Sequence, residues 1–563
     1  MSATKDSQQQ DYKLNLGEYQ PAVDRRLSIW EDRGFSSRFW GRDHTVWFQK
    51  PQPELTNRMA WLDIFEPMHG HLKAMFDFAE EVKMEGVRHI LLLGMGGSSL
   101  APEVFQRIFG KIKEYPSLLV LDSTHPDALR NIESKIDPAR TLFVVSSKSG
   151  TTTETSSFFY YFWNKIGETS ATPGRQFIAI TDPGTPLIRM ANERTFRRVF
   201  EGHPEIGGRY SALTLFGLVP AALIGVDSHQ LLDRGWDMAG ASASYLLEAE
   251  NPSLQLGAAL GELAQAGRDK LTFFATPSLA SFPDWIEQLV AESTGKNNKG
   301  IIPIVGEEIE EPWAYRKDRA FVYYELATEE NSELEKAIRA LEDAGHPVLR
   351  FKLNSKYDLG QEMFRWEMAV AASGAVLGTN PFDQPDVQLA KELARQAMEQ
   401  KTAPPKPGIK LDRGESETIS LEQKIVASKA FDSFLAGARI GDYISIQAYL
   451  APDPDVEAAL QDFRLSLRDR LKLATTLGWG PRFLHSTGQL HKGGPPSGVF
   501  IQLVDEMEKD IPVPETNYAF GQLIQAQALG DFRALKQLNR RVIRLNLGHD
   551  RTKGLSLLFD LLE

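Results

Sequence analysis

Two polar loops, each placed between an apolar run and a helical segment, carry the residues best suited to binding an anion. Gly94–Ser99 follows the apolar run Val87–Leu93, and Ser146–Thr153 follows Thr141–Val145. Such runs predict buried strands. A strand that enters a polar turn and then a helix leaves backbone N–H groups unpaired, and the helix dipole adds partial positive charge. The pattern predicts a phosphate site, although an ordinary helix cap needs only one of these hydroxyls.

The glycines of the first loop permit a tight turn and a close approach of a ligand to the backbone. A strand, a GxGG turn and a helix also suit a dinucleotide. However, Ser99 occupies the third glycine position of the dinucleotide fingerprint. No lysine follows the loop as it does in P-loop proteins, so P-loop nucleotide binding is not expected.

Glu292 is a candidate general base on the predicted helix Phe282–Lys296. It follows Trp285 by seven residues and Leu289 by three, so its carboxylate projects beside the apolar face of the helix. A carboxylate in that position is either a satisfied structural group or a partly desolvated base. The pattern alone favours the structural role.

Three further segments contain charged or imidazole side chains that could act in a site but that also have ordinary structural explanations. Arg209, before the apolar helical run Ala212–Ile224, also fits a turn cap or a surface ion pair. Lys391 lies away from the apolar stripe of the predicted helix Val387–Gln400, as a solvated lysine would. The segment His485–Gly494 is too polar and glycine-rich for a core element, and it contains two histidines.

Strands and helices alternate through the chain, which predicts βαβ units and doubly wound parallel sheets. Ligands bind such sheets at the carboxyl ends of the strands. A third set of strands forms either its own sheet or the remainder of the second. The predicted strands of the three sets are Val87–Leu93, Leu118–Leu121, Thr141–Val145, Phe177–Ile180 and Arg198–Phe200; Leu271–Ala275, Gly300–Val305, Ala320–Leu326 and Pro347–Leu353; and Asp442–Leu450, Phe483–His485, Gly498–Leu503 and Arg541–Leu545.

The domain organisation expected from these patterns has five parts. An N-terminal extension covers residues 1–50, and two α/β domains cover 51–226 and 227–400. A proline-containing linker spans 401–418, and a C-terminal α/β region with the histidine loop spans 419–563.

Composition narrows the class of protein and of partner. The 563 residues carry a net charge of −12, which argues against nucleic acid or an anionic membrane as the main partner. The chain has no cysteine, which excludes disulfides, thiolate nucleophiles and cysteine-bound metals. The polar first residues lack the apolar core of a signal peptide, so a cytoplasmic location is expected.

Six motifs together resemble those of the phosphoglucose isomerase (glucose-6-phosphate isomerase) family, and most closely the isomerase half of bacterial transaldolase–phosphoglucose isomerase fusions. The matching segments are Gly94–Ser98 for the GxGGS loop, Ser147–Thr155 for SKTxTTxET, Gly207–Ser211 for GGRFS, Glu292–Lys296 for ESNGK, Phe382–Lys391 for FDQxxVxLxK, and His485–Gly493 for HxxxQLIHQG.

The resemblance implies an α/β fold with two SIS-type (sugar isomerase) doubly wound parallel sheets, flanked by helices, and here an additional C-terminal α/β segment. It implies reversible conversion of glucose 6-phosphate and fructose 6-phosphate through a cis-enediolate, without metal or organic cofactor. Glu292 would be the base between C1 and C2, and Arg209 would stabilise the enediolate. His485 and Lys391 would open the sugar ring. The phosphate would be held by Ser98, Ser147, Lys148, Ser149, Thr152 and Gln384, beside the backbone of Gly96 and Gly97.

The chain departs from the family pattern at three places. Gly150 replaces a larger residue, and one residue is missing after His485, so either His485 or His491 can be the catalytic histidine; the loop match favours His485. The family places the histidine loop before the FDQ segment, whereas here it follows. In the family that histidine comes from the neighbouring subunit of a dimer, and the reordered chain offers a way to supply it from the same chain.

Two alternative functions fit parts of this pattern. One is a non-catalytic SIS protein that binds a sugar phosphate and regulates a partner; the other is an isomerase that also accepts mannose 6-phosphate. Binding alone would not need Glu292, Arg209, Lys391 and His485 together, so their joint presence favours an enzyme. The expected partners are a sugar phosphate, a second copy in a homodimer, and a functionally associated transaldolase. No Schiff-base barrel is recognisable, so transaldolase activity in this chain is not expected.

Overall fold

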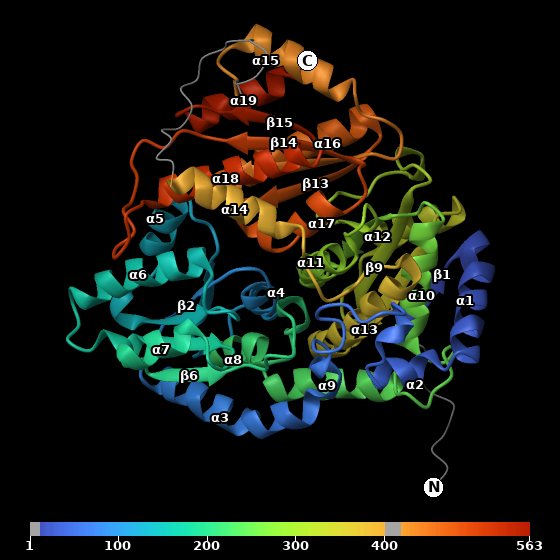
Figure 1. Ribbon diagram of the computed structural model, residues 1–563, viewed down its shortest axis with the longest axis horizontal. Coiled ribbons are helices and arrows are strands. Elements are labelled where there is room, and N and C mark those ends of the chain that lie inside the picture. The colour runs from blue at the N-terminus through green and yellow to red at the C-terminus, as the bar shows by residue number, and fades with distance from the viewer. Residues whose placement is uncertain (1–11, 400–417, 563) are drawn as a thin grey trace.

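Three five-stranded sheets run through the part of the chain that the computed structural model describes, residues 12–399 and 418–562. In Figure 1 the first sheet lies at lower left, the second at the right and the third across the top. Helices flank each sheet. This arrangement confirms the predicted α/β class with parallel sheets.

The first sheet is entirely parallel, with the strand order β3-β2-β4-β5-β6. The sequence places apolar side chains on both faces of its central strands, as a sheet covered by helices on both sides requires. Its strands are β2 (His89–Gly94), β3 (Ser117–Leu121), β4 (Thr141–Ser146), β5 (Phe177–Thr181) and β6 (Arg198–Glu201). Its helices are α3 (Phe65–Met84), α4 (Leu100–Phe109), α5 (Pro126–Lys135), α6 (Thr153–Gly167), α7 (Pro186–Glu193) and α8 (Leu215–Leu223).

The second sheet has the order β1-β10-β9-β7-β8 and is parallel except at β1. That strand, Tyr12–Asn15, lies within the predicted N-terminal extension and pairs antiparallel with β10. The other strands are β7 (Lys270–Ala275), β8 (Ile302–Ile304), β9 (Arg319–Leu326) and β10 (Val348–Leu353). The helices around this sheet are α1 (Gln20–Asp32), α2 (Phe35–Trp40), α9 (Ser228–Ala241), α10 (Pro252–Gln265), α11 (Phe282–Thr294), α12 (Ser332–Asp343) and α13 (Leu359–Leu377).

The third set of strands forms a separate parallel sheet, with the order β11-β15-β14-β12-β13. This observation decides between the two arrangements that the sequence left open. Its strands are β11 (Ile419–Ser420), β12 (Tyr443–Tyr449), β13 (Ala474–Trp479), β14 (Gly498–Val504) and β15 (Arg541–Asn546). The remaining helices are α14 (Val387–Glu399), α15 (Lys424–Leu435), α16 (Pro454–Leu471), α17 (Gly488–Gly493), α18 (Phe520–Gln537) and α19 (Arg551–Asp560).

One predicted strand is wrong. Phe483–His485 belongs to a 3₁₀ helix, η11 (Arg482–His485), and the strand of this region is β13. The segment Phe483–His485 is too short for its apolar content to separate a strand from a helical turn, whereas β13 pairs with β12 over its whole length.

The third unit packs against the second through a shared apolar cluster. Ala291 on α11 and Ile304 on β8 meet Tyr443, Leu490 and Phe500 of the C-terminal region. This cluster fixes α11 and α17 against each other, and both helices lie near the centre of Figure 1. The predicted domain boundaries stay a prediction, and the predicted linker 401–418 lies outside the described residues except for Thr418.

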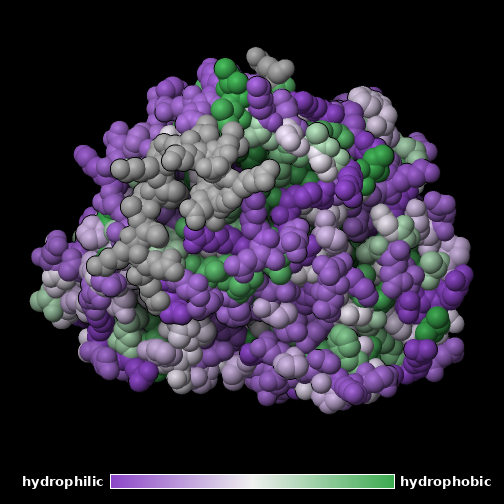
Figure 2. Space-filling view, turned by 45° about the horizontal axis from the view of Figure 1, so that its top comes forward, coloured by the Kyte–Doolittle hydropathy of each residue, from purple (hydrophilic) through white to green (hydrophobic). Residues whose placement is uncertain are grey.

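Hydrophobic side chains on the face shown in Figure 2 form small, separated areas among hydrophilic ones, apart from what the grey atoms cover. This face therefore shows no broad apolar surface of the kind that marks large protein interfaces. Within residues 12–399 and 418–562, no helix is both long and apolar enough to cross a membrane.

Candidate active site

The two loops predicted to bind an anion lie next to each other at the carboxyl ends of the strands of the first sheet. Strands β2 and β4 pair in parallel, with Gly94 opposite Ser146 at their carboxyl ends. Because β3 lies on the other side of β2, the strand order reverses between β2 and β4, which is where open α/β sheets bind ligands. The loops lead into α4 and α6, and residues of both loops line one large cleft.

The cleft collects all of the predicted site residues except Ser147. Ser147 is buried behind the loop, where its Oγ lies 2.9 Å from Thr152 Oγ1, so it supports Thr152 instead of facing the cleft. The predicted residues that line the cleft are Gly96, Gly97, Ser98, Lys148, Ser149, Thr152, Arg209, Glu292, Gln384, Lys391 and His485.

Lys148 points at a carboxylate of its own chain. Its Nζ lies 2.6 Å and 2.8 Å from the two oxygens of Asp182 and donates a third hydrogen bond to the carbonyl of His203. Burial lowers the pKa of Lys148, and Asp182 opposes part of that shift. A phosphate at this edge would therefore meet the hydroxyls and helix N-termini first, with Lys148 reaching it only by sharing its contact with Asp182.

Gly150 is held in a conformation that favours glycine. Its φ is +65°, in the left-handed region, and an added Cβ would lie 2.8 Å from Thr185 Cβ. The local backbone therefore favours glycine at this position, where the family that the chain resembles has a larger residue, and Thr185 occupies the space beside it.

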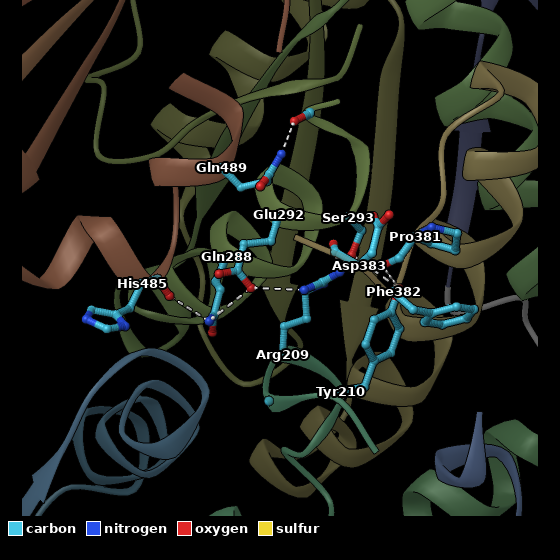
Figure 3. A network of polar contacts seen from close by, with 12 residues as sticks. Arg209, Tyr210, Gln288, Glu292, Ser293, Pro381, Phe382, Asp383, His485 and Gln489 are labelled. Carbon is cyan, nitrogen blue, oxygen red and sulfur yellow. Dashed lines mark hydrogen bonds and ion pairs between the residues drawn. The ribbon is translucent and has the colours of Figure 1, made fainter. Parts of the chain in front are cut away.

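Arg209 and Glu292 face each other in the cleft. Arg209 lies on the 3₁₀ turn η7 (Gly208–Tyr210), and Glu292 lies near the end of α11. Arg209 Nη1 is 3.3 Å from Glu292 Oε2, and its Nε donates to Ser293 Oγ at 2.9 Å. The other end of the guanidinium donates to the carbonyls of Pro381 and Asp383, as Figure 3 shows. These contacts fix the guanidinium while leaving one edge toward the carboxylate.

The electrostatics of Glu292 suit a base. Burial raises its pKa above the ordinary value, and Arg209, His485 and Lys296 oppose part of the shift. A carboxylate whose pKa lies above its usual range is a stronger base near neutral pH. The nearby guanidinium keeps a negative charge tolerable in this buried position.

Gln288 links Glu292 to the histidine loop. It lies one helical turn before Glu292 on α11, and its Nε2 contacts Glu292 Oε2 at 3.5 Å. The same nitrogen donates to the backbone carbonyl of His485 at 2.8 Å. Figure 3 shows Gln288 between Glu292 and His485, while the imidazole of His485 points away from Glu292.

The imidazole of His485 contacts the helix that follows the second loop. Its Nε2 lies 2.9 Å from Oε1 of Glu154, in the first turn of α6. Gln527 on α18 donates to the same carboxylate oxygen at 2.7 Å. Burial would raise the pKa of Glu154, but His485, a backbone hydrogen bond and the charge of Lys391 together outweigh it, and the pKa is lowered. An ionised Glu154 can therefore hold the imidazole of His485 in one orientation.

His491 occupies a different environment. It is almost fully buried on α17, where one ring nitrogen, Nδ1, lies 3.1 Å from Gln447 Nε2. Burial, with Lys492 and Arg540 nearby, lowers its pKa far below the ordinary value. His485 lines the cleft and His491 does not. The geometry therefore favours His485 as the histidine that can meet a ligand.

Lys391 and Gln384 lie on the rim of the cleft. Lys391 is exposed on α14, and its charge contributes to the lowered pKa of Glu154. Gln384 is exposed in the turn before α14. Both side chains can reach a ligand without first losing a buried contact.

Three residues of the cleft, Glu154, Gln288 and Gln527, carry no role in the motifs of the sequence. Glu154 lies within a recognised motif, and Gln288 precedes Glu292 by four residues on the same helix face, so helical spacing offered a signal for it. Gln527 is more than 370 residues from Glu154 in the chain, and only the packing of α18 brings the two together.

Comparisons with known proteins place the chain among sugar-phosphate isomerases by similarity. The model of a family described as phosphoglucose isomerase matches residues 69–302. A glucose-6-phosphate isomerase of Rubrobacter xylanophilus is 30% identical over 377 residues, which cover 57% of this chain and 85% of that protein. A probable glucose-6-phosphate isomerase of Methanococcus maripaludis is 26% identical over 385 residues, covering 62% of this chain and 86% of that protein.

Two crystal structures share the fold. A hypothetical protein from Thermus thermophilus has a TM-score of 0.59 at 24% identity, covering 68% of this chain and 99% of that one. A glucose-6-phosphate isomerase from Chlamydia trachomatis has a TM-score of 0.52 at 20% identity, covering 65% and 78%. Since the Rubrobacter relative is matched along most of its length, this chain belongs to the glucose-6-phosphate isomerase family.

Proposed function

We propose that this protein interconverts glucose 6-phosphate and fructose 6-phosphate as an aldose–ketose isomerase. The observation that carries the proposal is the buried pair of Glu292 and Arg209, 3.3 Å apart, in the cleft that also holds the two anion-binding loops. A proton-transfer base and a fixed cation are what isomerisation through an enediolate requires. Family membership supplies the substrate pair.

The loops after β2 and β4 would hold the phosphate through Ser98, Ser149 and Thr152, together with backbone N–H groups, and Gln384 would close over it from the rim. This anchoring fixes one end of the sugar, so that the C1–C2 bond lies at a set distance from the acid–base groups. Ser147 and Lys148 would act by shaping the loop, given their contacts with Thr152 and Asp182.

Ring opening would use His485 and Lys391. One of the two groups donates a proton to the ring oxygen as the C1–O5 bond breaks, and the other accepts the proton of the C1 hydroxyl. Glu154 would keep His485 oriented for this exchange. The product of the step is the open-chain aldose.

Isomerisation would then proceed at Glu292. Its carboxylate takes the proton from C2, and the electron pair of that bond forms the C1–C2 double bond while O1 becomes negative. Glu292 returns the proton to C1, and the proton of the C2 hydroxyl passes to O1. Arg209 lies where it can stabilise the negative oxygens of the enediolate.

Two alternative functions differ from this proposal in which sugar phosphates the protein would convert. A sugar-phosphate-binding regulator would bind fructose 6-phosphate without converting it, and a broader isomerase would also convert mannose 6-phosphate. A coupled assay with purified protein and each sugar phosphate, with and without a chelator, separates the three. Absence of any turnover would overturn the isomerase proposal, and loss of turnover on chelation by protein whose fold is retained would overturn the metal-free mechanism.

The partner proposals are a homodimer and a functional association with a transaldolase. Light scattering after size exclusion tests the first. Co-purification of a transaldolase with the tagged protein tests the second.

A further inference from the structure

Two histidines and an aspartate converge where α3 and α9 pack, outside the residues that line the cleft. His69 lies in the first half of α3, and His229 and Asp233 lie four residues apart on α9. His69 Nε2 is 3.2 Å from one oxygen of Asp233, and His229 Nδ1 is 3.2 Å from the other. In Figure 1 the two helices meet along the lower edge of the molecule.

The donor set has the chemistry of a transition-metal site. Two imidazole nitrogens and one carboxylate are ligands that zinc accepts, and three protein ligands leave a position for water. One donor atom from each residue lies within 4.8 Å of the others, a spread that small rotations of the side chains can close. The spacing of four residues places His229 and Asp233 on the same face of α9.

The imidazole of His69 faces the carboxylate of Asp233 from inside the cluster. Its Nε2 is screened from solvent and lies 3.2 Å from Asp233 Oδ1, yet within the described residues it makes no well-aligned hydrogen bond. A ring nitrogen that faces a carboxylate oxygen and a second imidazole in this way is placed to share an ion with them.

Neighbouring aromatic rings hold His69 in place. The ring of Trp236 lies 5.1 Å from that of His69 and stacks on Phe65 at 6.2 Å. His229 and Asp233 remain partly exposed, at 59% and 44% of their side-chain surface, so an ion can enter without unfolding the site. A fixed ligand on one helix and two accessible ligands on the other make a site that needs little reorganisation.

We propose that His69, His229 and Asp233 bind one divalent metal ion of the zinc class, which fastens α3 to α9. Helix α3 packs on α8 of the first sheet, and α9 packs on α13 of the second. The ion would therefore join the helix layers of the two sheets that border the cleft. Its role is structural, and it takes no part in isomerisation.

Zinc titration of the full chain, stripped of metal by chelation and dialysis, tests the proposal. Calorimetry should show one zinc ion per chain, and the ion should raise the midpoint of thermal unfolding. His229→Gln and Asp233→Asn should each weaken zinc binding more than about tenfold, since even the loss of an outer-shell partner costs that much. His71→Gln is the control, because His71 is exposed on α3, two residues after His69, and lies outside the cluster, so this variant should bind zinc as wild type does.

Three results would overturn the proposal: no zinc binding by the wild type, equal weakening in His71→Gln, or unchanged binding in both His229→Gln and Asp233→Asn. Far-ultraviolet circular dichroism of each variant checks that the fold is retained. As a second readout, cobalt bound in place of zinc should give a visible absorption band that disappears in Asp233→Asn. Isomerase turnover does not enter the test, so failure of one proposal leaves the other standing.

Discussion

Glu292 and Arg209 illustrate why the site depends on single residues. A buried carboxylate alone would be protonated more readily and would lose its charge, whereas a carboxylate in a tight ion pair would be a weak base. At 3.3 Å from one guanidinium edge, Glu292 has a pKa that is still raised. The balance between burial and one neighbouring cation therefore sets the pKa of Glu292.

Replacing Glu292 with Gln should lower kcat by roughly 10²–10⁴-fold, because the proton acceptor is removed while the shape of the side chain is kept. Binding of the sugar phosphate, measured by calorimetry, should change only a few-fold. Near-normal turnover by Glu292→Gln would show that another group is the base.

The pH dependence should respond to Arg209. Glu292 acts when ionised, so kcat/KM should fall as the pH drops through its pKa. Arg209 opposes the rise caused by burial, and its removal should raise that pKa further. The acid limb should therefore move to higher pH in Arg209→Gln and stay closer to its wild-type position in Arg209→Lys. An unmoved limb in Arg209→Gln would contradict the assigned pair.

Substitutions of His485 and His491 should differ in how they change turnover of a cyclic and an open-chain substrate. His485→Gln should lose turnover of glucose 6-phosphate, but should convert an aldose phosphate too short to form a ring nearly as well as wild type does. His491→Gln should mainly reduce stability, because His491 is buried and bonded to Gln447. Equal loss on both substrates in His485→Gln would place this residue outside ring opening.

At the scale of elements, close contacts between loops set the positions of the site residues. The turn after β2 meets the turn that carries Arg209 so closely that a Cβ on Gly97 would lie 2.2 Å from the carbonyl oxygen of Gly208. An added methyl group must push the two backbones apart, and with them the Gly94–Ser99 loop and Arg209.

Gly97→Ala should therefore lower the free energy of unfolding by about 2 kcal/mol, as overpacking of a rigid contact does. Gly208→Ala is the matched control, since nothing lies within 4 Å of its added Cβ. Chemical denaturation of both variants measures the difference. Equal stability of the two variants would mean that the loops can separate freely.

The sequence predicted most strands because buried parallel strands are apolar runs with clear ends, as at Thr141–Val145. It missed β1, whose four polar and apolar residues become a strand only by pairing with β10. The motifs located Glu292, Arg209 and His485 along the chain, but their distances depend on three sheets packing together. Partners such as Gln527 have no local signal for the same reason.

At the scale of the whole molecule, all three sheet units contribute to one cleft. Thr152 and Glu154 come from the first, Glu292 from the second, and His485 from the third. A chain that carries the histidine loop in reach of its own Glu154 does not need a second copy to complete these contacts.

Specific activity should therefore stay constant across a dilution series that spans any dimer and the monomer. Light scattering at each concentration gives the oligomeric state for comparison. Activity that falls in step with dissociation would show that a second subunit completes the site.

The central claim is that Glu292 moves a proton between C1 and C2, and isomerisation of fructose 6-phosphate in heavy water tests it most directly. Proton NMR should show solvent deuterium at C2 of part of the glucose 6-phosphate made by wild type, because the proton that Glu292 takes from C1 exchanges with solvent on the carboxyl group before transfer to C2. Glu292→Gln, at equal concentration, should form neither the product nor the label. Product formed by Glu292→Gln at the wild-type rate, with or without label, or no product from wild type, would contradict the account.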